Sequence, residues 1–211
     1  MKVKLLNLES KKTETFEVSD KIFKQKINYK LIKSVIDWQL NHLKPRTAKT
    51  KQKNEIKGST RKIVPQKGSG GARHASRKAP IFVGGGVAHG PKGAVYKIKK
   101  INKKVRKLAL AHTLTKKNSD KNLFILTDVK KEIKKTKEFN NFLKKNNLLN
   151  VVIISDLETL KNINKSARNI KDLKIINDAG ANIYDMMKYK NVLLTQSSVK
   201  NLEKRILNEK N

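Results

Sequence analysis

The segment NVVIISD, residues 150–156, contains a short apolar run, NVVII (150–154), which predicts a strand and is followed by an aspartate. Similar apolar runs occur at 122–126 (NLFIL), 173–176 (LKII) and 191–194 (NVLL). Segments with apolar residues at helical spacing alternate with these runs, at 136–145, 158–168, 182–188 and 196–208. Short apolar strands that alternate with helices are typical of a parallel sheet buried on both faces. The C-terminal half is therefore predicted to have an α/β fold.

The N-terminal residues extend this pattern. Residues 2–6 and 15–18 predict two short strands. A helix is predicted over 28–43 and should end before Pro45, because proline clashes with the preceding helical turn. Its apolar residues at helical spacing are Leu31, Ile32, Val35, Ile36 and Leu40. Another helix is predicted at 102–114, with a stripe formed by Val105, Leu108, Ala109 and His112.

Residues 44–93 have a different composition from the rest of the chain. The stretch 44–107 contains twenty Lys and Arg but only one acid, Glu55, and it holds nine of the ten glycines and all four prolines. Phe82 is the only aromatic residue of 44–93. Such a segment cannot bury enough apolar surface to offset its ordering entropy, so we expect it to be extended and mobile by itself. We predict one globular α/β domain, residues 1–43 and 94–211, interrupted by a long extended loop, residues 44–93.

The charge of the whole chain indicates a polyanionic partner. Fifty Lys and Arg stand against 17 Asp and Glu, a formal net charge of +33. Nucleic acid is the favoured polyanion, because basic side chains release its condensed counterions. An anionic membrane is less favoured, since no basic helix with a Trp/Phe/Leu face is visible. The chain has no cysteine, no signal peptide at its start and no apolar run long enough to span a bilayer, which predicts a cytoplasmic protein.

Three predicted strands are followed by an aspartate: Asp128, Asp156 and Asp178. The carboxyl ends of strands line the ligand crevice of doubly wound sheets, so these carboxylates could hold magnesium with a nucleotide. The alternative, which we favour, is that each aspartate caps the helix that follows it. Thr195 is a similar cap after the last strand.

Other catalytic patterns are incomplete. Gly85 and Gly90 have the spacing of a phosphate-binding loop, but Pro91 stands where lysine is required. Arg73 stands where the dinucleotide fingerprint requires glycine. The four histidines, His42, His74, His89 and His112, lack metal-ligand spacing. We therefore predict no enzyme activity, no metal and no cofactor.

The composition of 44–93 is best explained by close contact with folded RNA. Glycines let the backbone approach phosphate and ribose, while lysine and arginine neutralise phosphates and arginine also stacks on bases. A disordered cationic linker is the alternative that composition leaves open. The candidate RNA-binding residues are Arg61, Lys62, Gln66, Lys67, Gly68, Gly70, Gly71, Arg73, His74, Arg77, Lys78, Gly84, Gly85, Gly86, His89 and Lys92.

The run QKGSGGARHASRKAPIFVGGGVAHGPKG, residues 66–93, resembles the central loop of the universal large-subunit ribosomal protein L-four family, bacterial type. The stretch NKKVRKLAL (102–110) and the C-terminal half, including INDAGANIYDMMKYKNVLLT (176–195), are also similar to it. Local departures include Pro65, where the family usually has arginine, and Ala75, where glycine is common. The matching loop residues are Gln66, Lys67, Gly68, Gly70, Ala72, Arg73, Pro80, Gly84, Gly85, Gly86, Gly90 and Pro91.

The resemblance implies a three-layer, Rossmann-like α/β/α domain whose loop enters large-subunit (23S-type) rRNA. The loop tip, Pro65, Gln66, Lys67 and Gly68, would reach the wall of the peptide exit tunnel. Neighbouring large-subunit ribosomal proteins would be further partners. Some family members also repress their own operon by binding its leader mRNA, and the resemblance leaves this open here. Two alternatives remain: an α/β enzyme acting on RNA or a nucleotide through the three aspartates, and a free-standing RNA regulator that uses the same loop.

Overall fold

The computed structural model describes residues 1–8, 14–93, 100–133 and 135–207 of the 211-residue chain. The chain divides into two units. The first comprises Met1–Asn41 with Lys100–Asn211, and the second comprises His42–Lys99. Each unit is described by itself.

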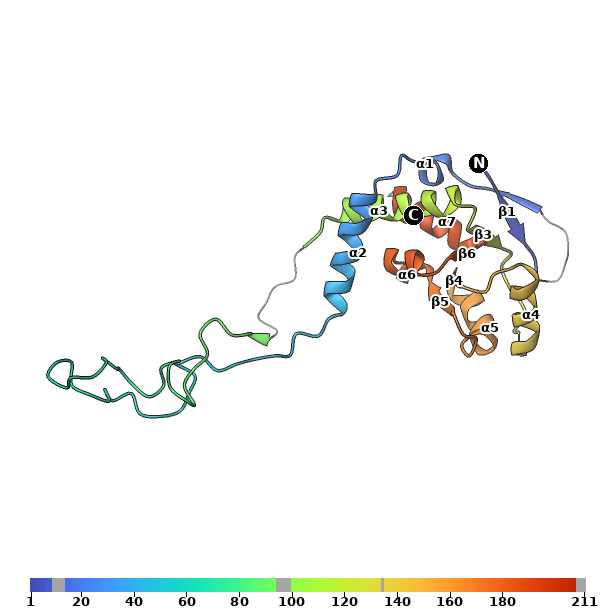
Figure 1. The fold of residues 1–211 in the computed structure, drawn as a ribbon. Coiled ribbons are helices and arrows are strands. Elements are labelled where there is room, and N and C mark those ends of the chain that lie inside the picture. The colour runs from blue at the N-terminus through green and yellow to red at the C-terminus, as the bar shows by residue number, and fades with distance from the viewer. Residues whose placement is uncertain (9–13, 94–99, 134, 208–211) are drawn as a thin grey trace. The chain divides into compact units, whose positions relative to one another are not determined.

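The first unit is built on one six-stranded sheet (Figure 1). Its strands are β1 (Lys2–Leu6), β2 (Glu14–Glu17), β3 (Leu123–Leu126), β4 (Val151–Ser155), β5 (Leu173–Asn177) and β6 (Asn191–Thr195). Their order in the sheet is β2-β1-β3-β6-β4-β5; β1 and β2 are antiparallel and all other pairs are parallel. The predicted, mostly parallel α/β fold is confirmed. The strand order differs from the 3-2-1-4-5-6 order of dinucleotide-binding domains. The resemblance to those domains is therefore limited to the layered arrangement, a mostly parallel sheet with helices on both faces.

The sheet separates two apolar cores. One core packs against α1 (Asp20–Phe23), α2 (Tyr29–Leu43), α3 (Lys103–Ser119), α6 (Ile183–Lys188) and α7 (Gln196–Leu207). The other packs against α4 (Thr136–Lys145) and α5 (Leu157–Ala167). Successive side chains of a strand point to opposite faces of the sheet, so one strand contributes to both cores. In β4, Val152 and Ile154 belong to the first core, while Val151 and Ile153 belong to the second. The expectation that uniformly apolar strands are buried on both faces is confirmed for β4 and β6 and nearly so for β3, but β5, at the edge of the sheet, is only partly buried.

Three elements differ clearly from prediction, and one of them is the unpredicted 3-10 helix η2 (Asp178–Gly180). The short helix α1 was not predicted, and α3 continues five residues beyond the predicted end at 114. Polar residues in the last turns of α3 are buried and form hydrogen bonds with other elements. The pattern of apolar residues alone therefore predicts too early an end for this helix. The Thr115 hydroxyl donates to the Ile22 carbonyl at 2.9 Å, and Lys117 Nζ donates to the Tyr189 carbonyl at 2.8 Å.

The predicted stripe of α3 was partly wrong. Leu108 is 43% exposed, whereas Leu110, Ala111 and Leu114 are buried. Helix α2 ends at Leu43, before Pro45, as predicted. The final helix, predicted to 208, is described to Leu207, and its last residue lies outside the described residues. None of the helices in the described part of the chain has the length and apolar character required to cross a membrane.

In the second unit, residues 44–92 form turns and bends with one isolated antiparallel bridge, between Lys49 and Lys92. Backbone hydrogen bonds join the outgoing and returning arms. The Thr50 amide donates to the Pro91 carbonyl at 2.9 Å, and the Val87 amide donates to the Lys51 carbonyl at 2.9 Å. Farther along, the Ile63 amide donates to the Ala75 carbonyl at 2.8 Å. The segment therefore has more internal hydrogen bonding than a simple extended chain.

Glycines serve two different purposes in this unit. A Cβ on Gly86 would lie 2.3 Å from the Lys53 backbone nitrogen, and one on Gly85 would lie 2.0 Å from the Ala79 carbonyl oxygen. Gly86 is therefore needed for close packing between the two arms, and Gly85 for a tight turn within the returning arm. Gly68, Gly70 and Gly84 instead have positive φ angles and nothing within 4 Å of a built Cβ.

Candidate nucleic-acid interface

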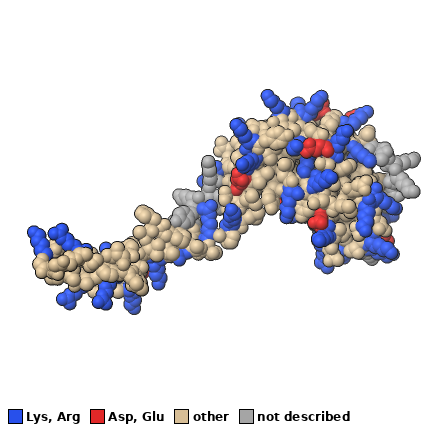
Figure 2. Space-filling model, in the orientation of Figure 1, with Lys and Arg blue, Asp and Glu red and all other residues tan. Residues whose placement is uncertain are grey.

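Cations cover the second unit. Arg61, Lys62, Lys67, Arg73 and Arg77 all have exposed side chains, and Lys78 is half-buried. On the face drawn in Figure 2, blue Lys and Arg side chains project from this unit and no Asp or Glu is visible on it. Glu55, the only acid in 44–93, accepts a hydrogen bond from the Gln52 amide at 3.1 Å. The cationic surface is therefore nearly free of competing carboxylates.

Four of these cations, together with Lys57, line one hollow. Residues 56–63 of the outgoing arm and residues 77, 78, 83 and 84 of the returning arm enclose a volume of about 540 Å³. The two arms are adjacent here, because a Cβ added to Gly58 would be in ordinary van der Waals contact with Lys78 Cε, at 3.6 Å. No Asp or Glu lines the hollow. Its cations are Lys57, Arg61, Lys62, Arg77 and Lys78.

The predicted tip, Pro65 to Gly68, is exposed. Lys62 Nζ donates a hydrogen bond to Gln66 Oε1 at 2.6 Å, which joins the tip to the adjacent arm. Gly68 has a φ of +83°, a conformation that a residue with a side chain rarely adopts. The backbone therefore turns at Gly68, and the neighbouring Lys67 is exposed.

The remaining predicted residues have mixed environments. The His74 ring packs edge-on against Phe82, with ring centroids 5.0 Å apart, so His74 helps to hold the unit together. His89 is exposed and has a φ of +55°. Lys92 is exposed and its backbone forms the bridge to Lys49. A Cβ added to Gly71 would lie 4.0 Å from the Ser69 carbonyl oxygen, so close packing does not require glycine there.

The strand-end aspartates bind protein groups. Asp156 Oδ1 accepts from the Glu158 amide at 3.2 Å and caps α5, as predicted. Asp128 instead accepts from the amide and hydroxyl of Ser197, at the start of α7. Asp178 accepts from Asn201 Nδ2 of α7 at 2.6 Å. The prediction that each aspartate caps the next helix is therefore right for Asp156 and wrong for the other two. Among the described residues, no three His, Asp or Glu are grouped so as to hold a metal ion.

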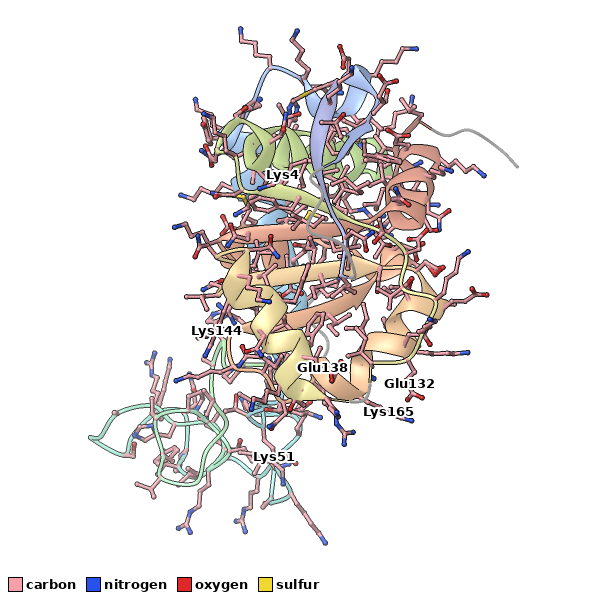
Figure 3. The ribbon with its side chains drawn as sticks, turned by 90° about the vertical axis from the view of Figure 1, so that its right-hand side faces the viewer. Lys4, Lys51, Glu132, Glu138, Lys144 and Lys165 are labelled. Carbon is pink, nitrogen blue, oxygen red and sulfur yellow. The ribbon has the colours of Figure 1, made fainter. Side chains whose placement is uncertain are left out.

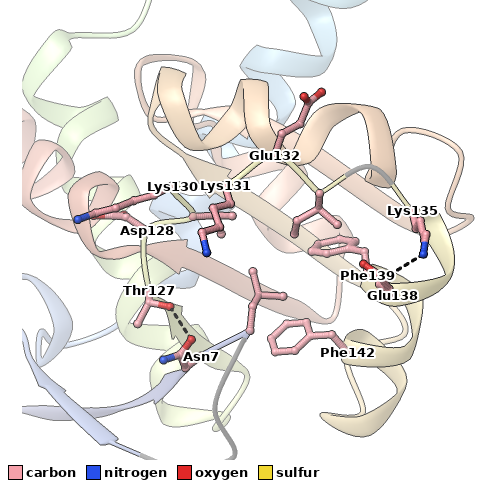
Figure 4. A pocket seen from close by; sticks show the side chains of 13 residues that line it. Asn7, Thr127, Asp128, Lys130, Lys131, Glu132, Lys135, Glu138, Phe139 and Phe142 are labelled. Carbon is pink, nitrogen blue, oxygen red and sulfur yellow. Dashed lines mark hydrogen bonds and ion pairs between the residues drawn. The ribbon is translucent and has the colours of Figure 1, made fainter.

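A pocket of about 670 Å³ lies at the carboxyl ends of β1 and β3 (Figure 4). Phe139 and Phe142 of α4 form part of its wall, and Lys131 points into it. Glu132 points away from it and pairs with Lys165 of α5 at 2.7 Å (Figure 3). Asp128 is the one strand-end aspartate that lines this pocket, so the pocket does not bring the three aspartates to one reacting centre.

Sequence reasoning missed the residues that complete the hollow. Lys57 lines it, together with the apolar side chains of Ile56, Ile63 and Val83. Val83 is fully exposed, at 107% of its reference area. The available signal was the presence of isolated bulky aliphatic residues in a cationic segment that has almost no core of its own.

The chain matches known proteins over nearly all of its length. Residues 16–205 match the model of the ribosomal protein L4/L1 family. A large ribosomal subunit protein uL4 from Pelagibacter ubique is 52% identical over 206 residues, which cover 97% of this chain and 99% of that protein. Proteins of the same name from Thermotoga petrophila and Rickettsia akari are each 37% identical, over 98% of this chain and 96% and 100% of theirs. The chain belongs to the ribosomal protein L4/L1 family.

Proposed function

We propose that this protein binds large-subunit, 23S-type rRNA through the segment 44–93 and helps to form the wall of the peptide exit tunnel. As a member of a ribosomal family, it is a structural constituent of the large subunit in the cytoplasmic ribosome and not an enzyme. Its partners there are rRNA and neighbouring large-subunit proteins. The observation that carries the proposal is the unit of residues 42–93, with its exposed cations and single acid.

Electrostatics supports rRNA as the ligand. Each cation that neutralises a phosphate releases counterions, so binding should weaken steeply with salt. The interior of this unit is too small to supply a conventional core, and hydrogen bonds between the arms leave its cations exposed. RNA phosphates would supply the missing interactions, as they do for other basic segments that order on binding.

The tip proposal rests on Gln66, Lys67 and Gly68. All three are exposed, and the turn at Gly68 leaves Lys67 at the surface. In this proposal Gln66 and Lys67 lie at or near the tunnel wall. Pro65 adds no charge and no backbone donor at this point. The predicted RNA contacts of the remaining site residues, including Arg73, His89 and Lys92, belong to the same proposal.

The same cationic unit is suited to a second RNA, the leader of the protein's own operon mRNA. Binding of that leader would make the protein an autoregulator of its synthesis. Competition between labelled leader RNA and unlabelled rRNA for the purified chain tests this directly, because a shared surface requires mutual displacement. Simultaneous binding of both RNAs would contradict a shared surface.

The decisive test is removal of residues 52–86, with Lys51 joined to Val87 through two glycines. The Val87 amide already donates to the Lys51 carbonyl at 2.9 Å, so this junction requires little rearrangement. We expect the variant to lose at least about a hundredfold in affinity for a 23S-type rRNA transcript at moderate salt. Its salt dependence should also become shallower, because eight Lys and Arg are removed.

Fluorescence of Trp38, the only tryptophan, serves as the control. It lies on α2 in the first unit, with the Arg106 guanidinium carbon 5.1 Å from its ring centroid. The deletion variant should keep the Trp38 spectrum and unfolding midpoint of the parent chain. Unchanged rRNA affinity in a variant that is folded by this criterion would overturn the proposal.

A further inference from the structure

The hollow between residues 56–63 and 77–84 combines two kinds of surface. One is cationic and consists of the five Lys and Arg described above. The other is aliphatic and consists of Ile56, Ile63 and Val83. A phosphate alone needs only the first kind of surface. A nucleotide needs both, because its phosphate is charged while its base and ribose have apolar faces.

Exposure makes the aliphatic side chains unusual. Val83 is fully exposed and Ile63 is 37% exposed. Both belong to a segment that has few bulky apolar residues, and the segment does not bury even these. Burial of these side chains against a ligand would contribute favourable binding free energy, because folding of the unit leaves them exposed. The turn Phe82–Gly85, closed by a hydrogen bond of 2.9 Å from the Gly85 amide to the Phe82 carbonyl, holds Val83 in this exposed position.

The shape of the hollow favours a single-stranded ligand. Its volume of about 540 Å³ lies within the range of small-molecule sites, roughly 300–1,000 Å³. An RNA duplex presents phosphates and 2′-hydroxyls on its outside and keeps its bases stacked within. The phosphates of a duplex could pair with the cations of the hollow, but its bases would not cover the aliphatic side chains. A nucleotide turned out of the stack covers both.

We propose that this hollow receives one unstacked nucleotide of single-stranded RNA. The base lies against Ile63 and Val83, and the flanking phosphates lie among the cations contributed by both arms. The RNA backbone then bridges the two arms. It contacts Arg77 and Lys78 of the returning arm and Arg61 and Lys62 of the outgoing arm. The inference rests on the proposed rRNA binding and adds a requirement for an unpaired nucleotide.

The test compares Val83→Ser with Ile81→Ser in the full-length chain. Both side chains are exposed aliphatic groups of the same segment, at 107% and 69%, but only Val83 lines the hollow. The probes are a fluorescein-labelled RNA single strand of about twelve nucleotides and a duplex of about the same number of phosphates. Dissociation constants are measured by fluorescence anisotropy over a series of KCl concentrations.

We expect the parent chain to prefer the single strand over the duplex. Val83→Ser should weaken single-strand binding about fivefold and leave duplex binding unchanged. The slope of log K against log salt should not change, because no charge is removed. Ile81→Ser should behave as the parent. Val83→Phe should strengthen single-strand binding about fivefold, because an aromatic ring stacks on a base better than an aliphatic group does.

Different failures have different meanings. If Val83→Ser and Ile81→Ser bind the single strand equally well, the nucleotide site is wrong while rRNA binding stands. A preference of the parent for the duplex has the same consequence. If the parent binds neither probe and also fails to bind the rRNA transcript, the proposed function falls and the nucleotide site falls with it.

Discussion

Asp185 is a buried carboxylate, 4% exposed, whose partners come from two elements. Its Oδ2 accepts from Lys174 Nζ at 2.6 Å and from Asn182 Nδ2 at 2.8 Å. Asp185→Ala should lower the free energy of unfolding by about 2 kcal/mol, since the Asn182 amide loses its shorter hydrogen bond and keeps only the one to the Gly180 carbonyl, at 3.4 Å. The contribution of the Lys174 ammonium is smaller, because its side chain is 45% exposed and water replaces the carboxylate. Urea denaturation measures the loss.

Asp120→Ala is the matched control for this substitution. Asp120 is 41% exposed and pairs with Lys116 across one helical turn, so its removal should cost well under about 1 kcal/mol. If the two variants lose equal free energy of unfolding, the burial of Asp185 does not determine how much it contributes to stability.

His112 should make stability depend on pH. Burial in α3 lowers the pKa of His112 below its usual 6.5, because desolvation disfavours the charged ring. The unfolded chain therefore binds the proton first as pH falls. The free energy of unfolding should be highest above about pH 6.5 and should decrease below it, until the pH reaches the folded pKa. The steepest slope from one such group is about 1.4 kcal/mol per pH unit.

His112→Gln should remove this part of the pH dependence. His42→Gln, a change at an exposed position of α2, should retain it. Urea unfolding at several pH values between about 7.5 and 5 provides the comparison. A His112→Gln variant that keeps the full acid-dependent loss would exclude His112 as its source.

At the scale of elements, the start of α7 is held by groups from two neighbouring strands. Thr195 Oγ1, at the end of β6, accepts from the Ser198 amide at 3.3 Å, and Asp128, after β3, accepts from the Ser197 amide at 3.1 Å. Asp128→Ala should therefore destabilise the protein by about 1–2 kcal/mol, as the loss of a helix cap does. Asp156→Ala, at the start of α5, should cost about 1 kcal/mol. Thermal unfolding checks both values, and an unchanged melting temperature for Asp128→Ala would contradict its role at α7.

The aspartates also show what local sequence reasoning can predict. Asp156 immediately precedes α5, so the capping rule identified its partner correctly. Asp128 is followed by residues 129–133, which are described and not helical, and its partner is set by the adjacency of β3 and β6. Strand order depends on residues far apart in the chain, which no local pattern contains. The strands themselves were predictable because their apolar runs reflect burial on both faces; β4, for example, was predicted at 150–154 and extends over Val151–Ser155.

At the scale of the molecule, composition identified the cationic segment but not its internal organisation. Net charge and glycine content are properties of the segment as a whole, and they pointed to RNA without reference to shape. The hydrogen bonds between residues 51 and 87 and between 63 and 75 join positions that no periodicity relates. The hollow lined by Lys57 and Val83 depends on those bonds, so it became visible only in three dimensions.

The net charge of +33 gives opposite salt responses to the free protein and its RNA complex. Fifty cations cannot all find partners among 17 acids, so the folded free chain repels itself. Raising KCl from about 50 to about 300 mM shortens the screening length and should raise the melting temperature by about 3 °C, equivalent to roughly 1 kcal/mol. The same salt should lower the melting temperature of the chain bound to rRNA, because it weakens phosphate contacts. Trp38 fluorescence can follow both transitions. A free chain that salt destabilises would mean that local ion pairs, such as Lys165 with Glu132, outweigh the excess of positive charge.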